Sequence, residues 1–166
     1  LWFLDLTAGD PERAARVVAA TGEQMGPALS PDGRWLAYAA DDTGRHEIFL
    51  QSFPAGESRV RVSSGGGETA RWSPDGRELY FLGENGSRVI AVAVKSEPKL
   101  ELGLPHELFG GTFRGESGTG PSFGVSADGG KFAMMQQAED PNRRLELVVV
   151  QNWFTELGKL FQPGSR

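Results

Sequence analysis

Few residues of this chain have the type and spacing that covalent catalysis needs. Ser122 lies in Gly-Pro-Ser-Phe-Gly, residues 120–124, which has the Gly-x-Ser-x-Gly spacing of a nucleophile elbow. An elbow needs a strand before the serine and a helix after it, whereas here a glycine-rich segment precedes and a β-rich segment follows. The two histidines, His46 and His106, form no recognisable triad arrangement with it, and we expect both at the surface or at a corner of the fold. The sequence therefore predicts that the chain is not an enzyme and has no catalytic residues.

The other candidate sites are a glycine-rich segment and two acidic turns. Residues 63–68, Ser-Ser-Gly-Gly-Gly-Glu, lack the Lys-Ser/Thr pair and the following helix of a phosphate-binding loop, so we interpret them as a connection between two structural units. The turns at residues 40–44 and 138–142 carry carboxylates, which suit hard cations, but their spacing differs from that of known calcium loops. We therefore predict no metal site and no cofactor.

The composition limits the classes of partner. The chain has 166 residues, which is enough for one domain with a hydrophobic core. Its net charge of -5 argues against nucleic acid, because binding a phosphate backbone needs a basic surface. It contains no cysteine, so it has neither a disulfide framework nor a thiolate metal site. No apolar stretch approaches the ~20 residues of a membrane span, and we expect no direct membrane insertion.

The elements that would position a site are arranged as a repeat. Ser-Pro-Asp-Gly-Arg occurs at residues 30–34 and at residues 73–77, and a weaker copy, Ser-Ala-Asp-Gly-Gly, lies at residues 126–130. The serines that open these copies are 43 and 53 positions apart, which indicates a unit of about 43 residues with an insertion before the last copy. Fixed periods of this size are typical of solenoids, propellers and arrays.

Each copy of the motif predicts a tight corner between two strands. In the first copy Pro31 presets φ at the first central turn position, and Asp32 can accept a hydrogen bond from a nearby backbone amide. Gly33 takes the positive φ that closes the turn. The same roles fall in the second copy to Pro74, Asp75 and Gly76.

The segments after the corners predict antiparallel strands. Those that follow directly are apolar at nearly every position, which indicates burial on both faces; they are residues 34–40, 77–83 and 130–136. After a polar turn comes another β-rich segment, at residues 46–53, 88–95 and 145–153, and then a weaker fourth strand at residues 58–64 and 105–111. The unit is thus a four-stranded meander, and its aromatic residues are predicted to pack in the core: Trp35, Tyr38, Trp72, Tyr80 and Phe81.

The ends of the chain fit the same repeat. Residues 1–6 and 13–21 match the third and fourth strands of a preceding unit, so we hypothesise that the chain is a piece of something longer. Residues 13–21 are also rich in Ala and Arg, which favour a short helix, although the register of the repeat favours a strand. Residues 155–160 suit one helical turn, and the glycine-rich residues 110–120 are expected to be mobile.

Four-stranded units of this length, with a tight turn near the start, are the blades of a β-propeller. The corners at residues 30–34 and 73–77, each with its apolar strand, resemble those of TolB-like, WD-repeat-like propellers of bacteria, over nearly the whole chain. Residues 148–160 are similar to the end of the C-terminal propeller of bacterial serine/threonine protein kinases. The resemblance implies an all-β fold of about three blades and an extracytoplasmic or periplasmic location, although the residues themselves leave the compartment undetermined.

This interpretation divides the chain into one propeller segment, a partial or half ring. Three blades are fewer than the four to eight that close a ring, so we expect self-association through blade faces or covalent continuation in a longer chain. One form is a two-fold dimer in which residues 16–21 complete the last blade of the other copy. The expected parts are the end of a preceding blade (residues 1–22), two blades (23–64 and 65–111), a last blade (112–154) and a tail (155–166).

In a propeller, the loops that enter the innermost strands form a concave face around the central channel. The resemblance places these loops at residues 25–27, 68–71 and 114–121. We expect a non-catalytic interaction or sensor module that binds a protein, peptide or small ligand on this face. The alternative is a propeller domain associated with an enzyme: the gating domain of a prolyl-oligopeptidase-like hydrolase, or a propeller lyase or glycosidase. The candidate ligand-binding residues are Glu68, Arg71 and Arg114.

Overall fold

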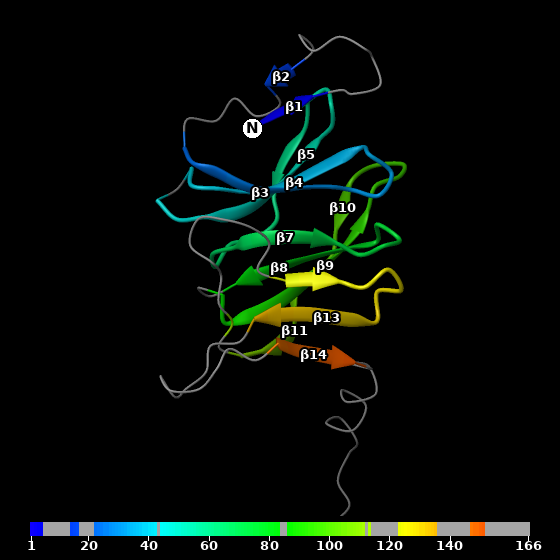
Figure 1. Cartoon of the computed structure of the whole chain (residues 1–166). Coiled ribbons are helices and arrows are strands. Elements are labelled where there is room, and N and C mark those ends of the chain that lie inside the picture. The colour runs from blue at the N-terminus through cyan, green and yellow to red at the C-terminus, as the bar shows by residue number, and fades with distance from the viewer. Residues whose placement is uncertain are drawn as a thin grey trace, which may run out of the picture.

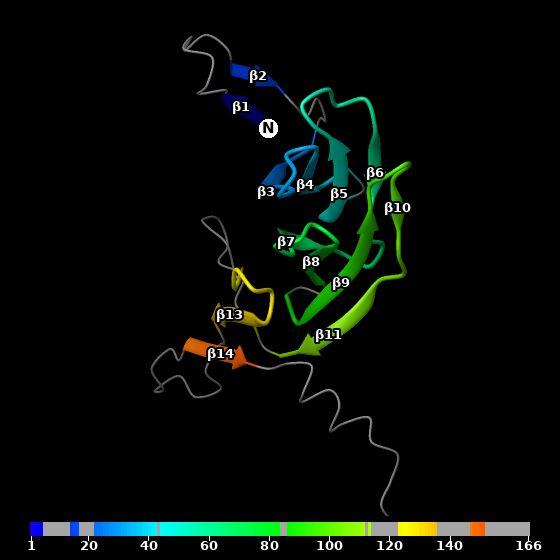
Figure 2. The ribbon, with the colours of Figure 1, turned by 90° about the vertical axis from the view of Figure 1, so that its right-hand side faces the viewer.

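The computed structural model of the chain describes residues 1–4, 14–16, 22–42, 44–83, 86–111, 113, 123–135 and 147–151. The described strands form antiparallel sheets that stack one on another from β1 to β14 (Figure 1). Figure 2 shows β1 and β14 at opposite ends of this stack, so the described sheets form an arc that does not close on itself. No helix in the part of the chain that the structure describes is long and apolar enough to cross a membrane.

The sheets follow the predicted repeat. A two-stranded sheet at the N-terminal end consists of β1 (Trp2–Leu4) and β2 (Ala14–Arg16). Blade 1 consists of β3 (Gln24–Leu29), β4 (Trp35–Ala40), β5 (Glu47–Ser52) and β6 (Arg59–Arg61), hydrogen-bonded in that order. Blade 2 consists of β7 (Glu68–Trp72), β8 (Glu78–Gly83), β9 (Arg88–Lys95) and two outer segments that both pair with β9, namely β10 (Glu101–Leu102) and β11 (His106–Gly110). The third sheet consists of β12 (Phe123–Val125), β13 (Lys131–Met135) and β14 (Leu147–Gln151).

The three corners have the predicted geometry. Gly33 and Gly76 both have a φ of 70°, and Gly129 has a φ of 72°, which is the left-handed region that glycine enters without steric cost. In the first corner the backbone amide of Arg34 donates to Oδ1 of Asp32 at 3.1 Å, as expected for an aspartate in this turn. The prediction of strand-to-strand corners is therefore confirmed in all three copies.

The serine that opens each corner forms two hydrogen bonds that are not predicted from the sequence. The Ser30 hydroxyl donates to Oδ1 of Asp32 at 2.6 Å and accepts from the backbone amide of Trp35 at 2.9 Å. Ser30 therefore ties the aspartate to the first residue of the next strand. The same two hydrogen bonds occur at Ser73 and at Ser126, with distances between 2.5 and 3.0 Å.

Neighbouring corners touch one another. A Cβ built on Gly76 would lie 3.4 Å from Cδ of Pro31, and one built on Gly129 would lie 3.5 Å from Cδ of Pro74. The proline of one corner thus packs against the glycine of the next. Among the described residues nothing lies within 4 Å of the corresponding position at Gly33.

The core lies between the sheets, which explains the apolar pattern of the middle strands. On β8, Leu79 and Phe81 point into the layer shared with blade 1, whereas Tyr80 and Leu82 point into the layer shared with the third sheet. Both faces are buried because a sheet lies on each side, and each such large side chain contributes about 1.5–3 kcal/mol. On β4 all residues after Trp35 are buried in the same way.

The third copy departs from the prediction. Phe132 and Met134 of β13 are buried against blade 2, but Lys131 and Ala133 are exposed, so the strand is buried on one face. The prediction of burial on both faces is wrong there, because no described sheet covers the other side.

The remaining fold predictions have mixed outcomes. The predicted core aromatics pack between sheets: Tyr38, Trp72, Tyr80 and Phe81 are buried and Trp35 is half-buried. The outer edge of blade 2, predicted as one strand, is divided into β10 and β11. The strand predicted over residues 13–21 is present at Ala14–Arg16. Residues 17–21, 155–160 and most of 110–120 lie outside the described residues.

Candidate functional site

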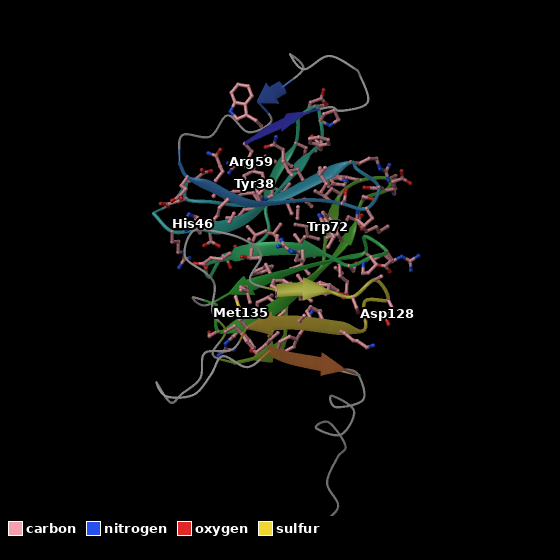
Figure 3. The ribbon with its side chains drawn as sticks, viewed as in Figure 1. Tyr38, His46, Arg59, Trp72, Asp128 and Met135 are labelled. Atoms are coloured by element: carbon pink, nitrogen blue, oxygen red, sulfur yellow. The ribbon has the colours of Figure 1, made fainter. Side chains whose placement is uncertain are left out.

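The candidate site is a pocket at the edge of the sheets opposite the corners. Figure 3 shows His46 at this edge and Asp128, a corner residue, at the other. The pocket has a volume of about 610 Å³ and lies where the β4–β5 loop, the connection between the two blades and the β8–β9 turn meet. It is lined by Arg45, His46, Gly65, Gly66, Gly67, Glu68, Leu82 and Ser87.

The connection between the blades is fixed by a buried carboxylate. Glu47, at the start of β5, is 1% exposed and accepts hydrogen bonds from the Ser63 hydroxyl and from the backbone amide of Gly66. Nε of Arg45 lies 2.8 Å from Oε1 of Glu47, and the same guanidinium donates to the carbonyl of Ser64. A buried carboxylate needs such partners. Glu47 therefore fixes the loop through these hydrogen bonds, and the guanidinium of Arg45 is paired with it.

His46 forms part of the pocket wall. Its backbone carbonyl accepts a hydrogen bond from the amide of Gly67 at 2.9 Å, which joins the β4–β5 loop to the connection. Its Nε2 atom is buried and has no hydrogen-bond partner among the described residues. The nearest described carboxylate, Oε2 of Glu23, lies 3.9 Å from Nε2, which is too long for a hydrogen bond. The sequence predicts a position at the surface or at a corner; in the structure His46 is half-buried, directly precedes β5 at the edge opposite the corners, and is one of the residues that line the pocket.

The strand that enters the pocket begins with a strained bulge. The register of β7 against β8 shifts between Glu68 and Ala70, and Thr69 between them has a φ of 41°. A β-branched residue at positive φ is a genuine outlier, and such strain concentrates at functional positions. The same bulge occurs in β3, where glycine occupies the equivalent position: Gly26 has a φ of 60°, and a Cβ built on it would lie 3.7 Å from Cα of Thr69.

The three predicted ligand-binding residues do not share one site among the described residues. Glu68 lines the pocket. Arg71, three residues further along β7, lies opposite Tyr80 of β8 and is not part of the pocket lining; its guanidinium donates to the carbonyl of Ala70 at 2.7 Å. Burial lowers the pKa of Arg71, and no carboxylate among the described residues pairs with it. Arg114 lies outside the described residues.

The other candidates are placed as follows. Asp42, in the first acidic turn, forms an ion pair of 2.6 Å with Arg59. No group of three or more His, Asp or Glu side chains suited to a metal ion occurs in the part of the chain that the structure describes. Ser122 and the acidic turn at residues 138–142 lie outside it. Residues 63–68 are predicted to connect the two blades; in the structure residues 62–67 do so, and Glu68 is the first residue of β7.

Sequence reasoning missed Arg45, His46 and Ser87 as neighbours of Glu68. Arg45 and His46 belong to blade 1, whereas Ser87 belongs to blade 2 together with Glu68. The packing of blade 1 on blade 2 therefore brings Arg45 and His46 to Glu68. The repeat predicts that β7 follows the connection, but no local pattern tells which turn of a blade faces the neighbouring strand. The glycine run was the available signal, because three consecutive glycines leave space that no side chain fills.

The fold defines the class of protein: these are antiparallel propeller blades, and the comparisons with known proteins agree. No family model matches the chain. The Tol-Pal system protein TolB of Alcanivorax borkumensis is 37% identical over 73 residues, which cover 42% of this chain and 17% of that protein. The solved structure of a putative TolB from Agrobacterium tumefaciens matches with a TM-score of 0.58 at 15% identity, covering 81% of this chain and 48% of that one. The crystal structure of TolB from Acinetobacter baumannii matches with a TM-score of 0.40 and 18% identity, covering 86% and 44%.

The predicted resemblance to TolB-like propellers is therefore confirmed: the chain has the blades of a TolB-like β-propeller. The predicted likeness of residues 148–160 to the C-terminal propeller of bacterial serine/threonine protein kinases stays a prediction. It spans about half the length of the solved TolB structures that it matches.

Proposed function

We propose that the chain is a non-catalytic interaction module that binds a protein or peptide partner at the pocket between blades 1 and 2. The observation that supports this is the pocket itself, whose volume of about 610 Å³ suits a few side chains of a partner. Its walls are loops held by rigid sheets, an arrangement that proteins commonly use for binding. The likeness to TolB, which is named as a protein of the Tol-Pal system, is in keeping with a protein partner.

The strained bulge supports the same location. Strain at Thr69 costs about 1–3 kcal/mol and is retained only where the surrounding structure imposes it. Thr69 directly follows Glu68, which lines the pocket, so the bulge sets the direction of the strand where a partner would bind.

The test is to select peptides on the 166-residue chain from a random dodecapeptide phage library and to measure their affinities by fluorescence anisotropy. Gly65→Trp places a large side chain at the pocket. It introduces no strain, because nothing lies within 4 Å of a Cβ at this exposed glycine. We expect Gly65→Trp to weaken binding at least about tenfold, which corresponds to ~1.4 kcal/mol.

The matched control is Leu104→Trp, which adds the same side chain at a position that is 89% exposed, in the turn between β10 and β11. It should leave the affinity unchanged. Selected peptides that bind Gly65→Trp as tightly as the parent would contradict binding at this pocket, and failure to select any specific peptide would contradict the proposed function.

A further inference from the structure

The charges around the pocket point to the chemistry of its ligand. Glu68 lines the pocket, and no cation among the described residues pairs with its carboxylate. Arg45, the cation that lines the same pocket, is already bound to Glu47 and to the carbonyl of Ser64. The exposed carboxylate of Glu23, which is not among the lining residues, lies 3.9 Å from Nε2 of His46. An anionic ligand would therefore meet repulsion, whereas a cationic group would gain an unpaired carboxylate.

A second observation is a buried ring nitrogen that has no hydrogen-bond partner among the described residues. This atom is Nε2 of His46, which is one of the residues that line the pocket. Buried polar atoms in proteins are nearly always hydrogen-bonded, so an orphan atom in a pocket wall indicates a group that arrives with the ligand. In the tautomer with the proton on Nδ1, Nε2 accepts a hydrogen bond.

Three of the residues that line the pocket are glycines and contribute only backbone. A Cβ on Gly67 would lie 2.7 Å from Cγ1 of Ile48, and Gly66 has a φ of 94°, so neither position accepts a side chain without strain. At Gly65 nothing lies within 4 Å of the position that a Cβ would take. A compact ligand group can therefore approach Glu68 without displacing protein side chains.

We propose that this pocket binds the primary ammonium group of a peptide, either a lysine side chain or the free N-terminus. An ammonium group has three N–H donors, which match the carboxylate of Glu68 and Nε2 of His46. The inference rests on the proposed function, since it names the chemical group by which a peptide partner is recognised.

The test uses three peptides and the ¹⁵N-labelled 166-residue chain. Acetyl-Ala-Lys-Ala-amide carries its ammonium on the side chain, Ala-norleucine-Ala-amide carries it at the terminus, and acetyl-Ala-norleucine-Ala-amide has none. We expect at least one ammonium peptide to shift the amide signals of residues 65–67 in a saturable way at low ionic strength. The neutral peptide should not, and a comparison of the two ammonium peptides separates the two sources.

Glu68→Gln keeps the shape of the side chain and removes its charge. We expect it to weaken binding of the ammonium peptide at least about tenfold. Glu101→Gln is the matched control, because Glu101 is an exposed residue of β10 that does not line the pocket, and it should bind like the parent. Retained dispersion of the amide spectrum shows that both variants are folded.

Three results would overturn the inference: equal binding of the neutral peptide, equal binding to Glu68→Gln, or signal shifts confined to residues outside the pocket. They are distinguishable from failure of the proposed function. Phage-selected peptides that lose affinity for Gly65→Trp but not for Glu68→Gln would leave the interaction role standing and refute ammonium recognition. Selected peptides that are insensitive to both substitutions would refute both.

Discussion

Thr69 has a strained backbone conformation, which glycine adopts without strain at the equivalent position of the preceding blade. It sits at the same place in the repeat as Gly26, and both have positive φ, but only glycine does so without strain. We expect Thr69→Gly to raise the free energy of unfolding by about 1 kcal/mol, because relief of ~1–3 kcal/mol of strain exceeds the entropic cost of a glycine.

The reciprocal substitution is the control. Gly26→Thr should lower the free energy of unfolding by about 1–3 kcal/mol, since it introduces the same strain into β3. Thermal or urea melts of both variants measure the difference. A loss of stability in Thr69→Gly would show that contacts of the threonine side chain outweigh its backbone strain.

The corner aspartates predict a dependence of stability on pH. The Ser73 hydroxyl, and then the backbone amide of Arg77, donate to Asp75 and lower its pKa below the usual value. A carboxyl whose pKa is lowered on folding stabilises the fold above its unfolded pKa of about 3.9, and this contribution is lost as the pH falls through the folded pKa. Asp32 and Asp128 are shifted in the same direction, chiefly by the hydroxyls of Ser30 and Ser126.

We therefore expect Asp75→Asn to be less stable than the parent at pH 7, with the difference shrinking as the pH falls below the unfolded pKa of about 3.9 and through the lowered folded pKa. Urea melts between pH 2 and 7 measure it. A difference that is constant over this range would mean that the ionised form of Asp75 is not what stabilises the corner.

At the scale of the elements, the corners differ in their tolerance of a side chain. Valine at positive φ is strained at both Gly33 and Gly76, but at Gly76 the new Cβ also approaches Pro31 to 3.4 Å. Gly130 has no positive φ, and its nearest neighbour is the side chain of Asp128 at 3.5 Å. We expect Gly76→Val to be the most destabilising, Gly33→Val to cost about 1–3 kcal/mol, and Gly130→Val to be the mildest.

Thermal melts of the three variants rank them. Equal and negligible shifts would mean that the corners do not limit stability, and a larger shift for Gly33→Val than for Gly76→Val would contradict the contact between neighbouring corners.

The strands could be predicted where the signal is local. The prediction for residues 88–95 matches β9 in full, because alternating β-branched residues between two turns specify a strand on their own. The positive φ of Gly33 follows from a four-residue turn. Arg45 and His46 could not be predicted as pocket residues, because their proximity to Glu68 depends on how blade 1 packs on blade 2.

At the scale of the whole molecule, the described sheets form an open arc. The outward face of β13 exposes Ala133 and leaves Met135 half-buried, and the sheet ends in strands that other strands can pair with or cover. We therefore expect the 166-residue chain to associate in solution through its outer blade faces, with two copies as the smallest symmetric form.

Light scattering over a concentration series from about 1 to 100 μM measures this association, and Ala133→Glu, which adds charge to the exposed face, should shift it toward the monomer. The matched control is Glu57→Gln, at an exposed turn of blade 1. A well-folded monomer at every concentration would refute association through blade faces.

In each contact between corners, the proline belongs to the earlier blade and the glycine to the following one, so the row of corners is directional. Its two ends are therefore unequal. Gly33 presents a bare glycine surface at which no described proline lies, whereas the third copy presents Ala127, which offers a following corner less surface than a proline. A preceding blade whose corner carries a proline could pack that proline against Gly33, as Pro31 packs against Gly76. A blade fused after the third copy would contact Ala127 instead of a proline, which is a weaker contact. Growth of the arc by engineering is thus favoured toward the N-terminal side, and restoring proline at Ala127 is the change that would make the two directions alike.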